Sequence, residues 1–546
     1  MIAAPKSGSG KTMITCALLQ LLKDNGKNVS SYKCGPDYID PMFHKKVLGV
    51  PSKNLDTFFT DEKTTVQLFL DERADGDFAV LEGVMGLYDG LGGIYEQGSS
   101  YHLAKVTQTP IILVVDAKGM GKSVLALIAG FLQYDTQHLI KGVLLNRMSK
   151  GYYDIIKPLI EKKLSVKVVG YFPEQKDIGL SSRYLGLVMP DELSDIKKQL
   201  NETADRLKKT IDMDLLKDIA AEADEIGDSE NADVYNEKSI GNCDQNEFSQ
   251  NKAINTVNIA VAMDEAFCFY YEDNLRLLEK CGSKLQYFSP LHDTELPDNC
   301  DALLLGGGYP ELYAKELSEN ISMRKSIKTA FEAGLPTVAE CGGFMYLHTY
   351  IHNQNCVFDM AGVLDGWCHF KGKLVRFGYI ELEEKNSNFL PSDEKIRAHE
   401  FHYYDSTDNG TDCIATKPAT GRKYDCVISR DNYWLGFPHI YYPSNPHFAE
   451  NFVKKAQGMK GIKMENSYKY FKNTDCKYFP CHKGLSDDFN CLFCYCPMYS
   501  MPNCPGSKTY IEKNGKKIKV CTDCTFPHRP ENYDKIIQIL IRNNNN

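Results

Sequence analysis

A glycine-rich loop followed at once by a helical pattern constrains the fold of this chain more than any other feature. The loop, PKSGSGKT at residues 5–12, matches the phosphate-binding pattern G-x-x-x-x-G-K-[ST], except that Pro5 stands where the first glycine is expected. Backbone N–H groups of such a loop face phosphate oxygens, and the N-terminus of the following helix favours the same negative charge. Only Met1 to Ala4 precede the loop, which is short for the strand expected there. The residues predicted to bind ATP are Gly8, Ser9, Gly10, Lys11 and Thr12.

Short apolar runs alternate with helical patterns through most of the chain. Apolar runs bounded by turn residues are typical of strands buried on both faces of a parallel sheet. With helices between them, they indicate an α/β fold. The predicted strands lie in FAVLE (78–82), IILVVD (111–116), GVLLN (142–146), VKVVG (166–170), VNIAVA (257–262), ALLLGGG (302–308) and LPTVAECGG (335–343).

A change of composition divides the chain into parts. Residues 221–250 hold nine acidic residues against one lysine and lack apolar periodicity, which predicts a disordered or loosely ordered linker. The length of 546 residues agrees with two or three domains. We expect a first α/β domain at 1–215, an acidic linker at 216–256, a second α/β domain at 257–456 and a cysteine-rich domain at 466–546.

Acidic residues at predicted turns and strand ends extend the phosphate site. KCGPDYIDP (33–41) places two aspartates three residues apart on a turn, and LEGVMGLYDG (81–90) ends a strand on a glutamate. Carboxylates near a phosphate loop are the expected partners of Mg²⁺, together with the Thr12 hydroxyl, while Lys11 reaches the outer phosphates. The candidates are Asp37, Asp40, Glu82 and Asp89, with Asn146 as a candidate for the adenine edge.

Cys341 stands between a strand pattern, PTVAE, and two glycines that precede a helical pattern. A strand, a sharp turn and a helix in this order are typical of a nucleophile elbow. The small glycine neighbours allow the strained backbone conformation of the nucleophile in such a turn. We expect the helix N-terminus to lower the pKa of the thiol. The candidate bases for this nucleophile are His399, His402, His439 and His447. The glycine loop LLLGGGYPELY (303–313) is a candidate oxyanion hole, formed by Gly307 and Gly308 together with Gly342.

Seven segments, occurring in order, give the chain a family resemblance. They are APKSGSGKT, KCGPDYIDP, EGVMGLYDG, DEAFCFYYEDNL, GGGYPELYA, AECGGFMYL and HEFHYY. Through them, residues 1 to about 456 resemble the cobyrinic acid a,c-diamide synthase family. The resemblance implies an ATP-binding synthetase domain similar to dethiobiotin synthetase, followed by a class I glutamine amidotransferase domain.

The resemblance also assigns roles to residues. It implies that Cys341 is the glutaminase nucleophile and that His439 activates it. Other triad amidotransferases carry a glutamate two residues after this histidine, where this chain has Tyr441, a departure that the cobyrinic branch shares. For the synthetase domain it implies Mg²⁺ and phosphate residues Thr12, Asp40 and Glu82, and residues near the activated carboxylate Asp37, Tyr38 and Asp89.

The two sites would serve one reaction. ATP converts a carboxylate, a poor electrophile, to an acyl phosphate that ammonia can attack. Free ammonia is mostly protonated at neutral pH, so the thiol would release it from glutamine, and we expect it to cross a path between the domains. The implied substrate is the corrinoid cobyrinic acid, a tetrapyrrole whose carboxylates Arg183 could bind. Hydrogenobyrinic acid or nickel sirohydrochlorin as substrate, and a non-catalytic P-loop metal-sensing switch, are the alternatives.

Eight of the 19 cysteines fall between residues 476 and 524. Two C-x-x-C pairs in a segment with few apolar residues predict a metal that substitutes for a core, either zinc or an iron–sulfur cluster. The predicted ligands are Cys476, Cys481, Cys491, Cys494, Cys496, Cys504, Cys521 and Cys524.

Charge and hydropathy limit the partners. The net charge of −9 does not suggest broad nucleic-acid binding, and no apolar run approaches the roughly 20 residues of a membrane span. No signal peptide is visible, which leads us to expect a cytoplasmic protein. The family resemblance suggests a homodimer.

Overall fold

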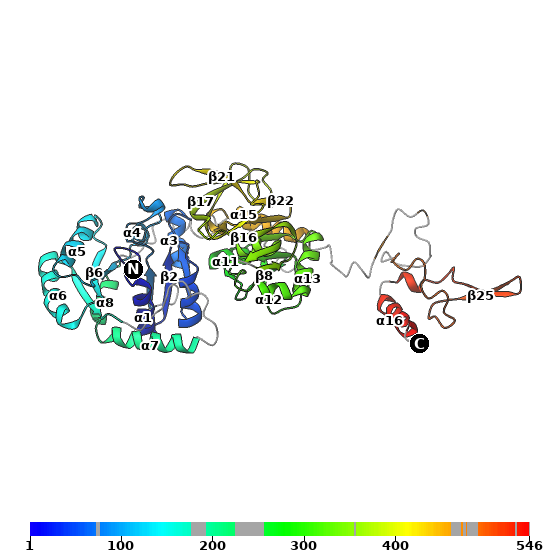
Figure 1. Ribbon diagram of the computed structural model, residues 1–546, viewed down its shortest axis with the longest axis horizontal. Coiled ribbons are helices and arrows are strands. Elements are labelled where there is room, and N and C mark those ends of the chain that lie inside the picture. Colours follow the sequence, from blue (N-terminus) through cyan, green and yellow to red (C-terminus); the bar gives the residue numbers. More distant parts are fainter. Residues whose placement is uncertain are drawn as a thin grey trace. The chain divides into compact units, whose positions relative to one another are not determined.

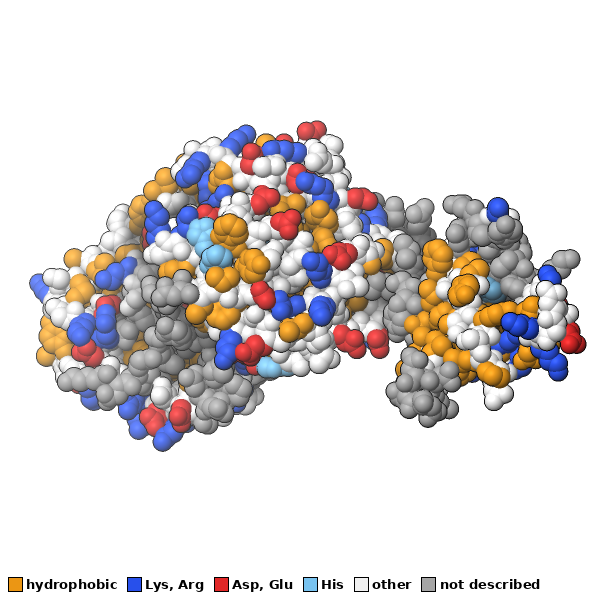
Figure 2. Space-filling view, turned by 45° about the vertical axis from the view of Figure 1, so that its right-hand side comes forward, with side chains coloured by type: hydrophobic (Ala, Val, Ile, Leu, Met, Phe, Trp, Pro, Cys, Tyr) orange, Lys and Arg blue, Asp and Glu red, His pale blue; other side chains and the backbone are white. Residues whose placement is uncertain are grey.

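The computed structural model describes residues 1–71, 77–175, 193–223, 256–353, 356–459, 471–472, 477, 490–529 and 532–544. The chain forms two compact units, Met1–Lys460 and Gly461–Asn546 (Figure 1). On the face of the larger unit seen in Figure 2, basic and acidic side chains are interspersed. No helix within these ranges is long and apolar enough to cross a membrane.

A seven-stranded parallel sheet organises the first part of the larger unit, with the order β3-β2-β4-β1-β5-β6-β7. Its strands are Ile2–Ala3 (β1), Val29–Cys34 (β2), Ser52–Leu55 (β3), Phe78–Glu82 (β4), Ile111–Asp116 (β5), Ile140–Asn146 (β6) and Lys167–Phe172 (β7). The helices are Lys11–Asp24 (α1), Ile39–Phe43 (α2), Glu62–Asp71 (α3), Ser100–Val106 (α4), Ser123–Tyr134 (α5), Lys150–Leu164 (α6), Leu193–Lys208 (α7) and Met213–Ala220 (α8), with short turns at His44–Leu48 (η1) and Leu91–Gly93 (η2).

This sheet is buried on both faces, which explains its continuous apolar strands. Along β5, Leu113 and Val115 belong to one core, while Ile112 and Val114 belong to the core on the opposite face. The predicted α/β fold is therefore confirmed. Helix α8 ends at Ala220, beyond the predicted domain end at residue 215, and most of the predicted acidic linker lies outside the described residues.

A second, six-stranded sheet has the order β10-β8-β11-β13-β23-β22, with only the edge strand β22 antiparallel. The strands are Val257–Ala262 (β8), Ser283–Phe288 (β10), Ala302–Leu305 (β11), Thr337–Glu340 (β13), Ile428–Arg430 (β22) and Tyr433–Gly436 (β23). The helices here are Glu272–Lys280 (α11), Ala314–Glu319 (α12), Ile321–Glu332 (α13), Gly342–Leu347 (α14) and His447–Met459 (α15), with a turn at Tyr442–Ser444 (η4). A small ladder pairs Phe267–Phe269 (β9) with Gly307–Gly308 (β12).

Two further sheets follow Cys341 in the chain, and the sequence analysis did not predict them. One has the order β15-β14-β16-β19, formed by His348–Asn353 (β14), Cys356–Asp359 (β15), Leu364–Phe370 (β16) and Tyr404–Ser406 (β19). The other is antiparallel, in the order β21-β20-β17-β18-β24, formed by Arg376–Glu384 (β17), Lys395–His402 (β18), Cys413–Thr416 (β20), Lys423–Cys426 (β21) and His439–Ile440 (β24).

The two α/β parts of the larger unit share a buried interface. Tyr441, from the second part, belongs to the apolar core of the first sheet. Its hydroxyl donates to Asp273 Oδ2 at 2.7 Å, and Asp273 Oδ1 lies 3.2 Å from Lys53 Nζ on β3. Tyr379 on β17 donates to Asp56 Oδ2 at 2.6 Å. Residues of both parts thus contribute polar partners to one buried interface.

The smaller unit contains little regular structure among its described residues. Thr509–Lys513 (β25) and Lys516–Val520 (β26) form a hairpin, followed by the turn Phe526–His528 (η5) and helix Tyr533–Asn544 (α16). Its apolar cluster centres on Met498, Cys504 and Ile536. This cluster is small, as the composition of the segment predicts.

Candidate active site

The phosphate loop joins β1 to α1, where the sequence places it. Gly10 has a φ of 92°, and a Cβ atom there would overlap the amide of Asn146. Asn146 ends β6 and is buried, and its Nδ2 donates to the carbonyl oxygen of Ser9 at 2.8 Å. The side chain that we predict to read adenine thus also holds the loop in place.

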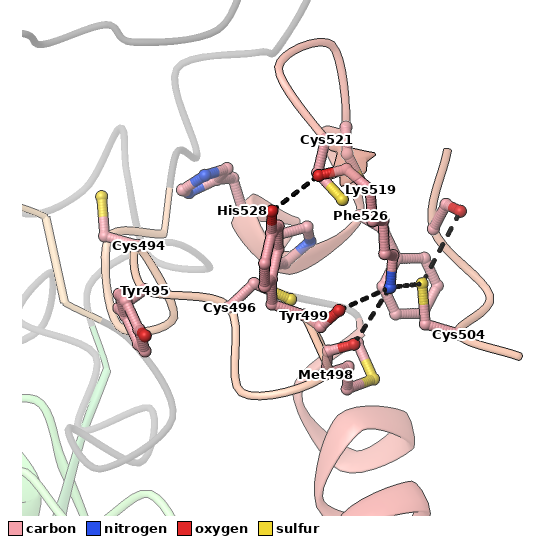
Figure 3. Close-up of a pocket in the computed structure, with 13 residues that line it drawn as sticks. Cys494, Tyr495, Cys496, Met498, Tyr499, Cys504, Lys519, Cys521, Phe526 and His528 are labelled. Carbon is pink, nitrogen blue, oxygen red and sulfur yellow. Dashed lines mark hydrogen bonds between the residues drawn. The ribbon is translucent and has the colours of Figure 1, made fainter. Parts of the chain in front are cut away.

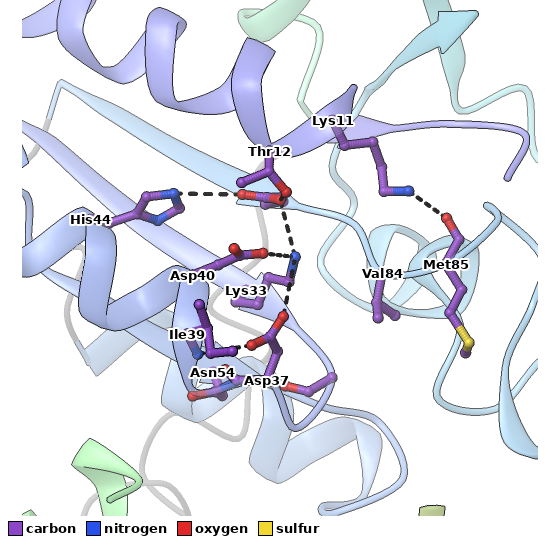
Figure 4. A network of polar contacts seen from close by, with 12 residues as sticks. Lys11, Thr12, Lys33, Asp37, Ile39, Asp40, His44, Asn54, Val84 and Met85 are labelled. Carbon is purple, nitrogen blue, oxygen red and sulfur yellow. Dashed lines mark hydrogen bonds and ion pairs between the residues drawn. The ribbon is translucent and has the colours of Figure 1, made fainter. Parts of the chain in front are cut away.

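Lys33, at the end of β2, lies among the carboxylates predicted to bind Mg²⁺ (Figure 4). Its ammonium pairs with Asp40 and lies 3.0 Å from Glu82 Oε1 and 3.9 Å from Asp37 Oδ2. Thr12 Oγ1 donates to Glu82 Oε1 at 2.6 Å. Burial raises the pKa of Glu82 to about 7. Burial acts to raise the pKa of Asp40 as well, but the Lys33 charge overrides it and the pKa is lowered.

These donors fit a magnesium ion. Thr12, Asp40 and Glu82 offer only oxygen atoms, the ligands that Mg²⁺ prefers. Glu82 Oε2 is buried without a hydrogen-bond partner among the described residues, and His44 Nε2 stands 3.5 Å from it. Sequence reasoning missed Lys33, although its position four residues before Asp37 in the same turn motif could have signalled it.

Lys11 and Asp89 contact the segment that follows β4. Lys11 Nζ donates to the carbonyl oxygen of Met85 at 2.5 Å (Figure 4), and burial, followed by the nearby Lys33 charge, lowers the pKa of Lys11 to about 8. Asp89 Oδ2 accepts the backbone N–H of Gly86 at 2.9 Å. Lys11 thus stands at the phosphate loop and stays mostly protonated at neutral pH, whereas Arg183 lies outside the described residues.

Cys341 forms the turn between β13 and α14 with a φ of 46° and a ψ of −101°, a backbone conformation that residues other than glycine rarely adopt. Gly343 N donates to Gly306 O at 2.9 Å, and a Cβ on Gly342 would lie 3.0 Å from Gly308 N. The predicted elbow and glycine loop are therefore in contact. The predicted direction of the thiol pKa is wrong, because burial, followed by the Glu311 charge, raises the pKa of Cys341 well above its usual value.

His439 on β24 packs against the same glycine loop, since a Cβ on Gly307 would overlap its ring. The ring is buried, and burial, followed by His402, lowers the pKa of His439 to about 3. Its Nδ1 has no hydrogen-bond partner among the described residues, and the nearest carboxylate is Glu340 Oε2, 4.0 Å away. The Cys341 elbow and His439 thus both contact the glycine loop, and Glu340, the carboxylate nearest to His439, directly precedes Cys341 in the sequence.

The other candidate bases lie elsewhere around this site. His399 pairs with His439 across the β18–β24 ladder, with ring centroids 6.4 Å apart. His402 stacks on Phe437 at 4.1 Å, and its Nδ1 faces the carbonyl oxygen of Tyr404 at 2.6 Å. His447 is half exposed and pairs with Glu394 at 2.8 Å. The structure therefore brings His439 and His399 to the glycine loop and its neighbouring ladder, and leaves His447 at the surface.

Tyr38 connects the two sites. It follows Asp37 in the synthetase turn, yet its ring stacks on Phe269 at 4.9 Å and lies 4.5 Å from Tyr271, both from the second part of the unit. Its ring centroid also lies 5.3 Å from that of His439. One residue thus separates the predicted carboxylate-activating side from the candidate glutaminase base.

The cysteines of the smaller unit surround a cavity of about 260 Å³ (Figure 3). Its lining includes Cys494, Cys496, Cys504, Cys521, Cys524 and His528. Within the described part of the chain, no three His, Cys, Asp or Glu side chains converge as metal ligands. Cys504 Sγ instead accepts from Lys519 Nζ at 3.1 Å. The described donors do not fit a metal in this arrangement, and Cys476 and Cys481 lie outside the described residues.

Comparison with known proteins places these sites in a family. Residues 1–185 match a CobQ/CobB/MinD/ParA nucleotide binding domain, residues 258–445 a CobB/CobQ-like glutamine amidotransferase domain, and residues 467–546 a cysteine-rich small domain. Cobyrinate a,c-diamide synthase of Clostridium tetani is 36% identical over 83% of this chain and 99% of its own length. The chain belongs to the cobyrinate a,c-diamide synthase family. The enzymes so named from Caldanaerobacter subterraneus and Listeria innocua are 38% and 36% identical, over 81% and 82% of this chain and 94% and 96% of theirs.

Membership of this family defines the class of reaction. The chain is a glutamine-hydrolysing carbon–nitrogen ligase of cobalamin biosynthesis, with a nucleotide-binding part and an amidotransferase part. The two sites described above lie in these two parts. The Clostridium tetani relative aligns with 83% of this chain, and residues 467–546 match the model of the cysteine-rich small domain.

Proposed function

We propose that this chain amidates the a and c side-chain carboxylates of cobyrinic acid, using ATP and glutamine-derived ammonia. The observation that carries the proposal is the position of Tyr38, which joins the P-loop carboxylate network to His439 within one buried interface. The names of the 33–38% identical relatives support the choice of substrate.

In the glutaminase half, Cys341 attacks the side-chain amide carbon of glutamine while its proton passes to His439. The C–N bond breaks, the proton returns to the departing nitrogen, and ammonia leaves a glutamyl thioester that water hydrolyses. The N–H groups of Gly307, Gly308 and Gly342 stabilise the oxyanion. Because the thiol pKa is raised by burial, proton transfer to His439 has to accompany the attack.

Glu340 takes the place of the missing triad glutamate in this proposal. It precedes the nucleophile, its Oε1 is buried without a hydrogen-bond partner among the described residues, and its Oε2 is the closest carboxylate oxygen to His439 Nδ1. A carboxylate at this point fixes Nδ1 as the protonated nitrogen and leaves Nε2 as the base. Tyr441, at the usual position of that glutamate, bonds to Asp273 instead.

In the synthetase half, a substrate carboxylate attacks the γ-phosphorus of ATP, and the P–O bond to ADP breaks, which leaves an acyl phosphate. Ammonia then forms the amide and displaces phosphate. Mg²⁺, held by Thr12, Asp40 and Glu82, would neutralise charge on the phosphates. Lys11 and Lys33 supply fixed positive charge at the same place, and the Gly8–Gly10 backbone binds the phosphates.

The predicted ammonia path passes Tyr38 in this scheme. Its stack with Phe269 and Tyr271 closes the space between the two halves to water, and an apolar wall suits an uncharged NH₃. The start of the second domain at residue 257 and the binding of a substrate carboxylate by Arg183 are further parts of the proposal.

The deciding experiment measures product mass after incubation with cobyrinic acid, ATP, Mg²⁺ and glutamine, for the wild type and Cys341→Ala. Each carboxylate converted to an amide lowers the mass by about one dalton. We expect a loss of two such units with the wild type, and amidation by the variant only when ammonium is supplied. No mass change from cobyrinic acid, but a change with hydrogenobyrinic acid or nickel sirohydrochlorin, would replace the substrate. ATP hydrolysis without any acceptor would favour the switch protein.

A further inference from the structure

Four aromatic side chains of the larger unit are exposed together. Phe370, Phe377, Phe401 and Tyr403 are 47, 57, 48 and 39% exposed, and we call them the aromatic patch. Scattered apolar residues on a surface need no explanation, but a contiguous group indicates a binding surface. The reaction scheme above uses none of these four side chains.

The rings of the aromatic patch form one continuous run. Phe377 on β17 lies directly across the ladder from Phe401 on β18, with ring centroids 5.7 Å apart. Phe401 lies 5.7 Å from Tyr403, and Tyr403 lies 6.5 Å from Phe370 at the end of β16. These are the spacings of rings in mutual contact, so the patch presents one aromatic surface.

One end of the patch continues into the candidate active site. Two residues further along the same face of the ladder, Tyr379 pairs with His399, and His399 pairs with His439 on β24. Tyr379 donates to Asp56 of the first part of the unit. The sheet face is therefore covered by the synthetase part at Tyr379 and open to solvent at Phe377.

The synthetase part contributes apolar residues beside this opening. The loop after η2 carries Ile94 and Tyr95, which are 77 and 50% exposed. A Cβ on Gly92, in η2 just before this loop, would lie 2.7 Å from Ala419 Cβ. Lys417, two residues before Ala419, donates from Nζ to the carbonyl oxygen of Phe377 at 2.7 Å. The loop and the patch thus adjoin the same segment of the second part.

Basic side chains border the patch. Lys371 and Lys373 are exposed in the turn that separates Phe370 from Phe377. Arg376 stands over the ring of Tyr424 at 4.2 Å and pairs with Glu400 at 3.4 Å. Lys371 Nζ also lies 3.9 Å from Asp405 Oδ2, and two lysines in one turn of a chain of net charge −9 suit a ligand that carries several carboxylates.

We infer that the aromatic patch docks the macrocycle of the tetrapyrrole substrate, with carboxylate arms directed to Lys371 and Lys373. The inference rests on the proposed function and adds the location of its substrate. A flat conjugated ring matches a run of aromatic faces, and the open sheet face leads from it toward the domain junction where a side-chain carboxylate is activated.

The test compares the full-length wild type with Phe377→Ala/Phe401→Ala and with a matched control, Tyr287→Ala. Tyr287 is also exposed, at 55%, but lies on β10, at the edge of the second sheet. Binding of cobyrinic acid and of sirohydrochlorin is measured by equilibrium dialysis, and glutamine hydrolysis is measured in parallel. We expect the double variant to weaken tetrapyrrole binding at least tenfold, with glutamine hydrolysis unchanged within twofold and the control unaffected.

The outcomes separate this inference from the proposed function. If the double variant binds within twofold of the wild type, or if the wild type binds neither tetrapyrrole, the docking site is wrong. If the variant loses binding while the wild type binds cobyrinic acid but never amidates it, the aromatic patch is supported as the docking site and the proposed reaction is wrong. A change in sedimentation of the double variant with binding retained would assign the patch to contact between copies of the chain and overturn the inference.

Discussion

Replacing Glu340 by glutamine tests the assignment of the orienting carboxylate most directly. At the 4.0 Å between Glu340 Oε2 and His439 Nδ1, a carboxylate stabilises a protonated imidazole by ~4 kcal/mol at an effective dielectric constant of about 20. Burial raises the pKa of Glu340 to about 8, so ionising it at pH 7 costs ~1.4 kcal/mol. The difference, ~2.6 kcal/mol, corresponds to a loss of roughly 100-fold in glutamine-dependent kcat/KM.

The assay measures glutamine hydrolysis and, separately, amidation supported by ammonium. We expect Glu340→Gln to lose only the glutamine-dependent rate. Glu340→Asp should keep part of that rate, because the shorter side chain retains a carboxylate but places it farther from His439 Nδ1. The pH profile gives a second readout. Since the raised pKa leaves Glu340 neutral below about 8, wild-type hydrolysis should rise as pH increases through that value, and the glutamine variant should lack this rise. The titratable groups that also face Glu340 or His439 are Tyr38, Tyr270, Tyr271, Tyr442, Cys341, His399 and His402.

Two results would refute this reasoning. Hydrolysis by Glu340→Gln within twofold of the wild type at pH 7 would show that His439 needs no such partner. An equal fall of the glutamine- and ammonium-dependent rates would show that Glu340 acts on the fold, not on the histidine.

Three further perturbations follow from the site. Tyr38→Ala should raise the number of glutamines hydrolysed per amide formed several-fold, because the stack with Phe269 and Tyr271 is lost; an unchanged ratio would exclude Tyr38 from the ammonia path. Gly307→Ala should reduce glutamine hydrolysis at least tenfold and spare ammonium-dependent amidation, since the added Cβ overlaps His439; equal loss of both would contradict this. Lys53→Met should lower the free energy of unfolding by about 3–5 kcal/mol, because it leaves Asp273 charged and buried, and denaturant titration beside an exposed control, Lys315→Met, measures it.

The sequence predicted the parts of the fold that obey simple patterning. The apolar runs of β4, β5 and β6 are buried on both faces, so composition alone identified them. Strands β2 and β3 escaped prediction because VSSYKC and SKNL are polar. Their polar side chains are buried for a reason that the linear pattern cannot show: Lys33 faces the site carboxylates and Lys53 faces Asp273.

The candidate site was predictable residue by residue but not as an arrangement. Motifs indicated Cys341, the glycine loop and the phosphate loop, whereas the Glu340–His439 pair joins β13 and β24, which are far apart in the sequence. The direction of the Cys341 pKa was wrong because a rule for helix N-termini was applied to a helix of six residues, where burial dominates.

The shared interface of the two α/β parts bears on how such enzymes can be built. Because Tyr441 lies in the core of the first sheet and Asp273 bonds to Lys53, each part would expose an incomplete surface if made alone. Folding of the larger unit should therefore depend less on the peptide link between residues 223 and 256 than on the presence of both parts at the same time. A polypeptide that ends at residue 223 and one that starts at residue 256 should associate into a working heterodimer when they are expressed together. Neither should be recovered in soluble form when it is expressed alone.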